Sequence, residues 1–240
     1  MRLHFSCYKK DARVDFENCV KRYGQTSLER ASAHIVFGGD GATLDVLHQQ
    51  VEQCLNVPIF ALNYGKIGYL TNQKDWHDLP DRILGAERVC VSPLTVQATL
   101  CPDGRRVEAY AFNEFSFFRG PSMQAVDLKI IGKNSQYDIF GDGVMIATPL
   151  GANAYLKSAG GPQLPRNSNM LAIHGNNVSE PFSMVVPSDT VIAIASRQHN
   201  KRPVRIECDS KRAIDGVSRA VIQMAHQRKQ TLLFEKIKSR

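Results

Sequence analysis

No stretch of this sequence is apolar for long enough to cross a membrane. A spanning helix needs about 18 or more consecutive apolar residues, and the 240 residues contain no run that approaches this length. The segment from Met1 to Ser6 is short and polar, and charges at Lys9, Lys10 and Asp11 follow it, so it is not typical of a secretory leader. We therefore expect a cytoplasmic protein with no membrane partner.

Patterns typical of disulfide frameworks and metal sites are also missing. The six cysteines are scattered without a Cys-x-x-Cys pair, and the seven histidines form no His-x-x-x-His pair. Dispersed cysteines of this kind indicate reduced, mostly buried thiols. We expect no disulfide framework and no metal ion held by the protein's own side chains.

The chain has neither a long basic block nor an aromatic–glycine motif of the kind that binds RNA. Its formal net charge is nonetheless +7. A positive excess favours an anionic partner. Because nucleotides carry several negative charges, nucleotide substrates account for this balance, and we expect no nucleic-acid partner.

The first part of the sequence alternates short apolar runs with segments of helical periodicity. This alternation predicts a parallel sheet with crossover helices, in which ligands bind at the carboxyl ends of the strands. We assign residues 1–88 to a Rossmann-like α/β domain. On its second helix, Leu44, Leu47 and Val51 are predicted to face inward and Gln50 outward. The predicted strands are residues 3–7, 35–37 and 57–62, and the predicted helices are residues 11–23, 42–55 and 74–85.

Beyond residue 85 the apolar residues recur with period two. Short alternating runs separated by Gly, Pro, Asn and Asp predict an antiparallel sheet, so residues 89–225 are assigned to an all-β sandwich domain. Residues 226–240 are a candidate addition to the first domain. The predicted strands include residues 89–91, 94–100, 107–111, 126–130, 191–195, 204–208 and 221–224.

A glycine turn with one acidic residue, Gly38-Gly39-Asp40-Gly41, separates the second strand from the second helix. Glycines let backbone N–H groups approach an anion, and a helix N-terminus adds partial positive charge, so the turn suits a phosphate group. A carboxylate beside phosphates is repelled unless it binds a metal or accepts a proton, which favours a chemical role for Asp40. The alternative is a plain turn in which Asp40 caps the helix, and this segment alone leaves the two equally open.

Four further clusters accompany the glycine turn. They are the loop 63–71, the pair Asn113-Glu114, the run 141–149 and the run 151–162. The Asn-Glu pair can form hydrogen bonds with sugar hydroxyls or base edges. Small residues in the last run let a ligand approach the backbone, and Tyr155 offers a ring that can stack on a base.

In order and content these segments resemble one family, the NAD kinases, in particular the short bacterial ATP-NAD kinases. The family pattern consists of a GGDG turn, an N-x-G-x-x-G-F-L loop, an Asn-Glu pair and a long D-G…T-P-x-G-S-T-A-Y-x-x-S-A-G-G-P stretch. Here these stand at residues 38–41, 63–70, 113–114 and 142–162. The GGDG turn is shared with lipid kinases and phosphofructokinases, so the last two motifs give the resemblance its specificity. It covers nearly the whole chain.

The resemblance implies transfer of the γ-phosphoryl group of ATP to the 2′-hydroxyl of the adenosine ribose of NAD, which makes NADP. It implies that Asp40 is the general base on that hydroxyl, and that the backbone of Gly38, Gly39, Asp40 and Gly41 lies near the ATP phosphates. Mg²⁺ or another divalent cation would bridge those phosphates as a cofactor, whereas NAD is a substrate. The family also implies a homodimer or homotetramer.

For the NAD-binding side, the resemblance implies that Asn113 and Glu114 hold the adenosine portion. Asp142 and Ala154 would contact the nicotinamide end, and Tyr155 would pack against a ring.

Three more residues complete the implied binding set. Ser158 would add a hydroxyl hydrogen bond, Asn153 precedes the Ala-Tyr pair, and Tyr69 stands where the family commonly has Phe, lining the same cleft. Asp209 and Lys211 lie in a later polar break, where turn chemistry at a strand end is favoured over contact with the site.

Structural roles remain open for several of these residues. Partly buried core packing is as compatible with Tyr69 and Tyr155 as ligand contact is. Turn-capping between strands competes with ligand binding for Asn113 and Asp142.

The chain departs from the family pattern at a few positions. Ala42 replaces the usual Thr or Ser after GGDG, and the neighbouring Thr43 is not expected to substitute for that hydroxyl. Ala152-Asn153 replaces Ser-Thr, and Phe140 stands where many members carry a basic residue. These changes leave open the catalytic rate, the donor (ATP or polyphosphate) and the preference for NAD or NADH.

Two other functions compete with an active NAD kinase. The departures motivate a catalytically weakened protein that binds or senses NAD(H) or NADP(H) on the same fold. A lipid kinase ranks last, because an Asn-Glu-Val motif within the helix after the glycine turn is missing, and Asp45-Val46 stands there instead.

Overall fold

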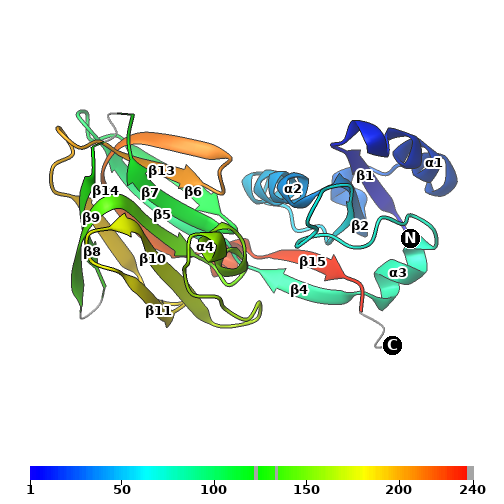
Figure 1. Ribbon diagram of the computed structural model, residues 1–240. Coiled ribbons are helices and arrows are strands. Elements are labelled where there is room, and N and C mark those ends of the chain that lie inside the picture. The colour runs from blue at the N-terminus through cyan, green and yellow to red at the C-terminus, as the bar shows by residue number, and fades with distance from the viewer. Residues whose placement is uncertain (122–123, 133–134, 237–240) are drawn as a thin grey trace. The chain divides into compact units, whose positions relative to one another are not determined.

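The computed structural model describes residues 1–121, 124–132 and 135–236 (Figure 1). The chain divides into two compact units, Met1–Val91 with Arg228–Arg240, and Ser92–Gln227. The boundary drawn from the sequence at residue 88 falls just before this division, because β4 (Glu87–Val91) pairs with β15 (Gln230–Phe234) within the first unit. Of the candidate addition 226–240, residues 237–240 lie outside the described residues.

The first unit is built on a five-stranded sheet in the order β1-β2-β3-β15-β4. Strands β1, β2, β3 and β15 run parallel, and β4 is antiparallel to β15. This confirms the predicted α/β architecture. The bounds are β1 (Leu3–Cys7), β2 (Ala33–Gly38), β3 (Ile59–Asn63), α1 (Arg13–Tyr23), α2 (Asp40–Glu52) and α3 (Leu79–Gly85), with 3₁₀ turns at Lys10–Ala12 and Leu28–Arg30.

Strand β2 is buried along its whole length, as expected for a central strand of a covered parallel sheet. On α2, Leu44, Leu47 and Val51 face the core as predicted, but Gln50 is fully buried and not outward-facing. The Gln50 amide oxygen accepts the backbone N–H of Val57 at 2.7 Å, and its amide nitrogen lies 3.5 Å from Nδ1 of His34. Because its amide oxygen and its amide nitrogen both have partners, this polar side chain can be buried at a position that hydrophobic periodicity does not predict for a polar residue.

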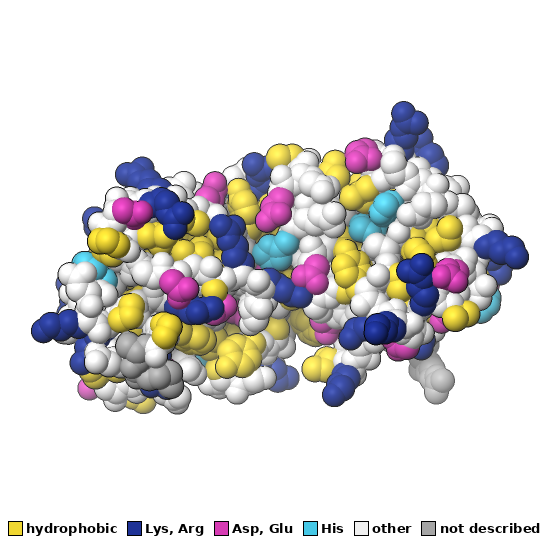
Figure 2. Space-filling view, turned by 90° about the horizontal axis from the view of Figure 1, so that it is seen from above, with side chains coloured by type: hydrophobic (Ala, Val, Ile, Leu, Met, Phe, Trp, Pro, Cys, Tyr) yellow, Lys and Arg dark blue, Asp and Glu magenta, His cyan; other side chains and the backbone are white. Residues whose placement is uncertain are grey.

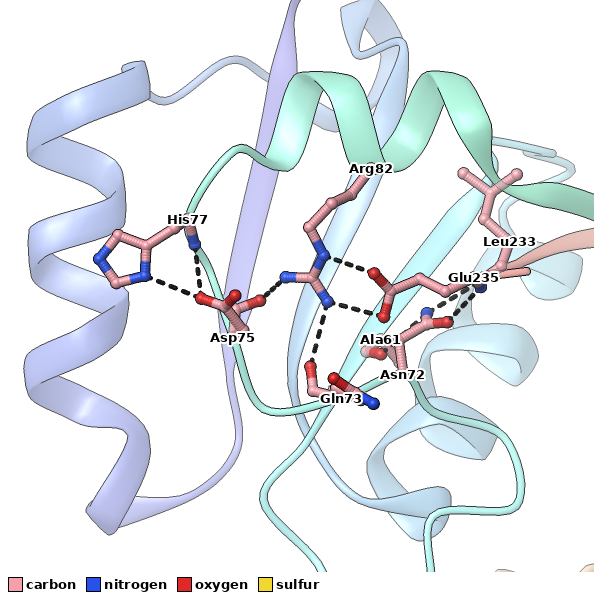
Figure 3. A network of polar contacts seen from close by, with 8 residues as sticks. All are labelled: Ala61, Asn72, Gln73, Asp75, His77, Arg82, Leu233 and Glu235. Carbon is pink, nitrogen blue, oxygen red and sulfur yellow. Dashed lines mark hydrogen bonds and ion pairs between the residues drawn. The ribbon is translucent and has the colours of Figure 1, made fainter. Parts of the chain in front are cut away.

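The helix predicted for residues 74–85 begins only at Leu79. Asp75 accepts hydrogen bonds from both the backbone and the ring of His77, which fixes a tight turn ahead of the helix (Figure 3). Asp78 then has a left-handed backbone (φ 49°), and a proline occupies the first helical turn. Proline is tolerated there because the missing N–H would have no partner within the helix.

The C-terminal end of β15 is fixed by polar contacts with the segment before α3 (Figure 3). Arg82 donates to both carboxylate oxygens of Glu235, at 2.6 and 2.8 Å, and also to the backbone carbonyl of Gln73. The buried Asn72 side chain donates to the carbonyl of Leu233 and accepts the N–H of Glu235. These contacts explain how a strand from the end of the chain is held in the first sheet.

The second unit is an antiparallel sheet in which β11-β10-β9-β7-β13-β14-β12-β8 are consecutive, and β5 joins through β14 and carries β6. An additional pairing of β8 with β9 closes part of the sheet into a ring. This confirms the predicted all-β second domain. The strands are β5 (Leu94–Leu100), β6 (Arg106–Ala111), β7 (Glu114–Arg119), β8 (Val126–Ile131), β9 (Gln136–Ala147), β10 (Met170–Val178), β11 (Ser183–Pro187), β12 (Ile192–Ser196), β13 (Val204–Cys208) and β14 (Arg212–Met224).

Four of these strands, β7, β9, β10 and β11, are missing from the sequence prediction. Strand β7 alternates polar and apolar residues over its first four positions, but it is short, opens with Glu114 of the polar pair and is buried on both faces there. Strand β9 contains Gly141 and Gly143, and β10 contains Gly175, and glycine is depleted inside strands and more typical of the turns between them. A short 3₁₀ turn (Gly151–Asn153) and the short helix α4 (Tyr155–Ser158) lie between β9 and β10.

None of the helices in the described ranges is both long and apolar enough to span a membrane. On the face shown in Figure 2, Lys and Arg side chains occur singly or in small groups among acidic and apolar ones.

Candidate functional site

In the first unit, the glycine turn lies where the sequence places it, between a central strand and a helix. Strand β2 ends at Gly38, Gly39 is the N-cap of α2, and Asp40 is the first helical residue. The N–H groups of the first helical turn have no acceptor within the helix and carry the positive end of its dipole. The turn therefore offers backbone donors at the carboxyl end of a parallel strand.

The Asp40 side chain joins this turn to the loop that follows β3. Its Oδ2 accepts the backbone N–H of Tyr69 at 3.0 Å, and its Oδ1 accepts that of Leu70 at 2.7 Å. Each carboxylate oxygen has a second lone pair that these bonds do not use. Asp40 is thus held in a fixed position and is still only partly buried.

The two glycine segments of this unit pack backbone against backbone. A Cβ added at Gly39 would lie 3.1 Å from Cα of Gly65, and a Cβ added at Gly65 would lie 3.1 Å from Cα of Gly39. The N–H of Tyr64 donates to the carbonyl of Gly38 at 2.7 Å, and Asn63 Oδ1 accepts the N–H of Gly65 at 2.9 Å. The glycines at 39 and 65 are therefore explained by close approach between the two loops.

The hydroxyl that follows the glycine turn is already bonded to the backbone of the turn. Ala42 is buried, and Thr43, which is fully buried, donates its hydroxyl back to the carbonyl of Gly39 at 3.2 Å. The proton of the Thr43 hydroxyl is therefore engaged within the helix, and the expectation that Thr43 does not replace a hydroxyl at residue 42 stays a prediction.

In the second unit, the Asn113-Glu114 segment is held by Asp209. The Asp209 carboxylate accepts the backbone N–H groups of Phe112 at 2.7 Å, Asn113 at 2.8 Å and Glu114 at 3.0 Å. Asp209 is 5% exposed and has a left-handed backbone (φ 51°) in the turn between β13 and β14. Sequence analysis favoured plain turn chemistry for Asp209. The turn is present, but the side chain also orders the Asn-Glu pair.

Thr148 fixes the same segment from the other side. Its hydroxyl donates to the carbonyl of Phe112 at 2.6 Å, and its N–H donates to the carbonyl of Asn113 at 2.9 Å. A Cβ at Gly151 would meet the carbonyl oxygen of Asn113 at 2.1 Å, so the start of the 151–162 run must be glycine here. The sequence clusters 113–114 and 148–151 are thereby brought together.

Two side-chain oxygens of the Asn-Glu pair remain without a hydrogen-bond partner within the described residues. They are Oδ1 of Asn113 and Oε2 of Glu114, and both are buried. Buried polar atoms normally have hydrogen-bond partners, so these two oxygens are candidates for contact with a ligand. Burial, and secondarily the negative charge of Asp209, raise the pKa of Glu114 to about 8.

The predicted site residues after Thr148 differ in exposure and in hydrogen bonding. Asn153 donates to the backbone carbonyls of Pro149 and Leu164, which gives it a structural role besides any ligand contact. Tyr155 is 53% exposed, so core packing does not account for it. Ser158 is exposed and Ala154 is partly exposed. Both side chains are therefore accessible.

Asp142 lies away from the Asn-Glu pair within this chain. Across β7 and β9, Glu114 pairs with Ala147 at one end, and Phe118 pairs with Gly143 at the other. Asp142 forms an ion pair with Arg119 at 3.1 Å and accepts a hydrogen bond from Asn177 at 2.9 Å. The structure thus separates Asp142 from Asn113 and Glu114 along the length of β7, and its nicotinamide role stays a prediction.

Phe140, the departure two residues before Asp142, is 44% exposed. The guanidinium of Arg202 lies over its ring, 5.1 Å from the ring centroid. A basic group therefore stands beside the position at which many members carry a basic residue.

Among the described residues, no group of three or more His, Cys, Asp or Glu side chains is placed to hold a metal ion. Residues 112–234 match the family model described as the ATP-NAD kinase C-terminal domain. A protein named NAD kinase from Brucella suis biovar 1 (strain 1330) is 33% identical over 242 aligned positions, which cover 98% of this chain and 92% of the relative.

Two solved structures share the fold. A structure of yeast NADH kinase complexed with NADH superposes with a TM-score of 0.80 at 16% identity, covering 98% of this chain and 84% of that one. A structure of an NAD kinase from Archaeoglobus fulgidus in complex with ATP superposes with a TM-score of 0.77 at 19% identity, covering 99% and 94%. These two structures agree with the family model and the Brucella relative. The family model and that relative show that the chain belongs to the NAD kinase family of phosphotransferases.

Proposed function

We propose that this chain transfers the γ-phosphoryl group of ATP to the 2′-hydroxyl of the adenosine ribose of NAD, with Asp40 as the general base. The observation that carries this assignment is the fixed position of the Asp40 carboxylate. It stands at the first turn of α2, beside Gly38 and Gly39, and two backbone N–H groups hold it. The match to kinases does not favour the alternative of a protein that binds nucleotides without turnover.

The proposed reaction needs a proton acceptor and a donor-binding surface in the same place. An unused lone pair on the Asp40 carboxylate accepts the proton of the attacking hydroxyl, which typically accelerates such a step by about 10²- to 10⁴-fold. The backbone N–H groups at the start of α2 bind the phosphate oxygens of the donor. The N–H groups of Tyr69 and Leu70 keep the carboxylate in place while it acts.

A divalent cation is proposed to arrive with the donor. A bare carboxylate beside a triphosphate is repelled, and Mg²⁺ bound to the phosphates offsets that charge. Within the described residues, no cluster of three metal-ligating side chains offers an alternative cage. MgATP is therefore treated as one substrate, and NAD as the other.

The acceptor nucleotide is proposed to bind the second-unit motifs. The unpartnered oxygens of Asn113 and Glu114 suit hydroxyl or amino groups of the adenosine portion. Thr148 contacts the backbone of residues 112 and 113, and the run that follows Thr148 is proposed to extend the same binding surface. The residues of that run are Asn153, Ala154, Tyr155 and Ser158. Asp142 is retained as a proposed contact to the nicotinamide end.

Self-association as a dimer or tetramer and a cytoplasmic location are further proposals that rest on the family resemblance. Sedimentation of the purified chain tests the first, because a monomer over the whole working concentration range contradicts it. Fractionation of the producing cell tests the second.

The decisive experiment is Asp40→Asn, assayed for NADP formation with MgATP and NAD. We expect kcat to fall by about 10²- to 10⁴-fold, with little change in NAD affinity. The matched control is Asp81→Asn, which alters an exposed aspartate in the first turn of α3 and should retain full activity. If wild type forms no NADP with ATP, other nucleoside triphosphates or polyphosphate, the proposal is wrong. If Asp40→Asn is as active as wild type, only the role of Asp40 is wrong.

A further inference from the structure

The Glu114 carboxyl group is buried with no donor provided for a negative charge. The residue is 4% exposed, and its Oε2 has no hydrogen-bond partner in the described part of the chain. An ionised carboxylate normally requires hydrogen-bond donors or a cation when it leaves water. Nothing of that kind is found at the Glu114 side chain in the described residues, so its surroundings favour the uncharged form.

Asp209 takes the donors that a second carboxylate would need. It accepts the N–H groups of residues 112, 113 and 114, including that of Glu114 itself. All three donors therefore point to the Asp209 carboxylate, and none of them is left for the Glu114 side chain. A nearby carboxylate charge disfavours a second one, which adds to burial in raising the pKa of Glu114.

The other titratable groups around Glu114 do not reverse this balance. Cys208, paired with Phe115 across β13 and β7, stays a neutral thiol because burial raises its pKa to about 12. Lys211 and Arg212, from the same turn as Asp209, have exposed side chains. On the β9 side, Ala147 and Thr148 carry no charge. Asp209 is the charge that acts on the Glu114 carboxyl.

We propose that Glu114 meets the acceptor nucleotide as a neutral carboxylic acid that donates a hydrogen bond to a ligand oxygen, and that Asp209 is the positioning residue that holds it in this state. The proposal rests on the proposed function for the identity of the ligand. It adds a protonation state and a direction for the hydrogen bond.

The chemistry singles out a sugar hydroxyl as the group recognised. A hydroxyl oxygen can accept the Glu114 O–H and donate its own hydrogen to the unpartnered Oδ1 of Asn113. Since the pKa of Glu114 lies at about 8, the neutral acid predominates at neutral pH without a bound ligand. Binding then requires no proton uptake below this pH. Above this pH, the Glu114 carboxylate must take up a proton before the nucleotide can bind in this way.

Infrared spectroscopy of the free protein tests the protonation state without any nucleotide. Exposed Asp and Glu side chains are ionised at pH 7, so the C=O stretch of a carboxylic acid at that pH reports a buried neutral acid. We expect a band that disappears in Glu114→Gln and titrates near pH 8. It should persist in the control Glu180→Gln, which changes an exposed glutamate of the same unit. Equal spectra for wild type and Glu114→Gln at pH 7 would overturn the proposal.

Calorimetric titration with NAD between pH 6.5 and 9.5 tests the direction of the hydrogen bond. Wild-type affinity should stay constant up to about pH 8 and then fall, approaching tenfold per pH unit. Glu114→Gln, whose amide also donates, should remain within about threefold of wild type at pH 7 and lose this pH dependence. An affinity that rises through pH 8, or a folded Glu114→Gln that no longer binds at pH 7, would show that the carboxylate is the binding form.

Asp209→Asn separates positioning from simple scaffolding. Loss of its charge should lower the midpoint of the wild-type pH profile, whereas a purely structural loss weakens binding at every pH and leaves the midpoint in place. If wild type binds no NAD at any pH, the proposed function fails, and the infrared band still decides the state of Glu114.

Discussion

The two units of this protein each use one aspartate to join segments that are distant in the sequence, but the two aspartates differ in what they leave free. Asp209 is buried and uses its carboxylate on three backbone N–H groups of residues 112–114. Asp40 accepts two N–H groups and is partly exposed at a helix N-terminus. Asp209 therefore serves the architecture of a binding segment, whereas Asp40 retains capacity for a ligand.

One buried titratable group from each unit shows the same difference. In the first unit, His34 lies 2.8 Å from the hydroxyl of Ser6 and 3.5 Å from the amide of Gln50. In the second, Oε2 of Glu114 has no partner among the described residues. A buried polar group with partners is explained by the fold alone. A buried group without partners, in a segment predicted to bind a ligand, is a candidate contact for that ligand.

Removing the two aspartates should separate these roles, with the largest effect on stability at Asp209. Asp209→Ala leaves three N–H groups without an acceptor, and we expect the free energy of unfolding to fall by about 3 kcal/mol or more. Asp40→Ala leaves two N–H groups on a partly exposed loop that water can reach, so a loss of about 1 kcal/mol is expected. Urea unfolding measures both.

The matched control is Asp215→Ala, which removes an exposed carboxylate of β14 whose partner Arg205 lies 3.5 Å away. It should change the free energy of unfolding by less than about 0.5 kcal/mol. Equal losses at Asp209 and Asp40 would remove the distinction between a scaffolding and an acting carboxylate.

Acid should destabilise the first unit through His34. Burial, and then the nearby His4, lower the pKa of His34 to about 3. Its unfolded-state pKa is about 6.5. A base whose pKa is depressed on folding contributes stability above the unfolded value and loses it as pH falls. The contribution of His34 should therefore decline by up to about 1.4 kcal/mol per pH unit between pH 6.5 and 3.

The difference in unfolding free energy between wild type and His34→Asn, followed from pH 7.5 to 4.5, isolates this contribution. It should shrink as pH falls, because only wild type must protonate His34 on unfolding. His77→Asn, at an exposed histidine of the same unit, is the control for the loss of an imidazole from the surface. A constant difference between wild type and His34→Asn would contradict the assignment.

The sequence was most informative where local pattern and tertiary role coincide. The apolar run at residues 35–37 was predicted to be a strand, and the glycine turn that follows it lies at the carboxyl end of β2. The start of α3 was misplaced, because helical spacing from residue 74 concealed the Asp75 turn and the left-handed Asp78.

In the second unit, local signals failed where glycine serves close packing inside a strand. Gly141 and Gly143 lie in β9, where an added Cβ would meet the backbone of Asn177 at 2.3 Å and of Phe117 at 2.0 Å. The partnership of Asp209 with residues 112–114 could not be predicted either, because it depends on the pairing of β13 with β7. The one local signal was an Asp at a strand-end turn.

The smallest effects should come from ion pairs, and here too the two units differ. The Arg82–Glu235 pair of the first unit is bidentate, with side chains 14% and 29% exposed, and Arg82 also donates to backbone carbonyls (Figure 3). The Arg205–Glu207 pair of the second unit is more open, with 36% and 30% exposed. Glu235→Gln should therefore cost about 1–2 kcal/mol of unfolding free energy, and Glu207→Gln less than about 0.5 kcal/mol.

Salt provides the control for this last pair of variants. Exposed pairs are screened by high salt and partly buried ones much less. The cost of Glu235→Gln should thus persist in 1 M NaCl, and any cost of Glu207→Gln should vanish. If both costs vanish, the contacts at the end of β15 are surface electrostatics, and the attachment of the C-terminal strand to the first sheet must come from its backbone pairing and its buried Leu232 and Leu233 alone.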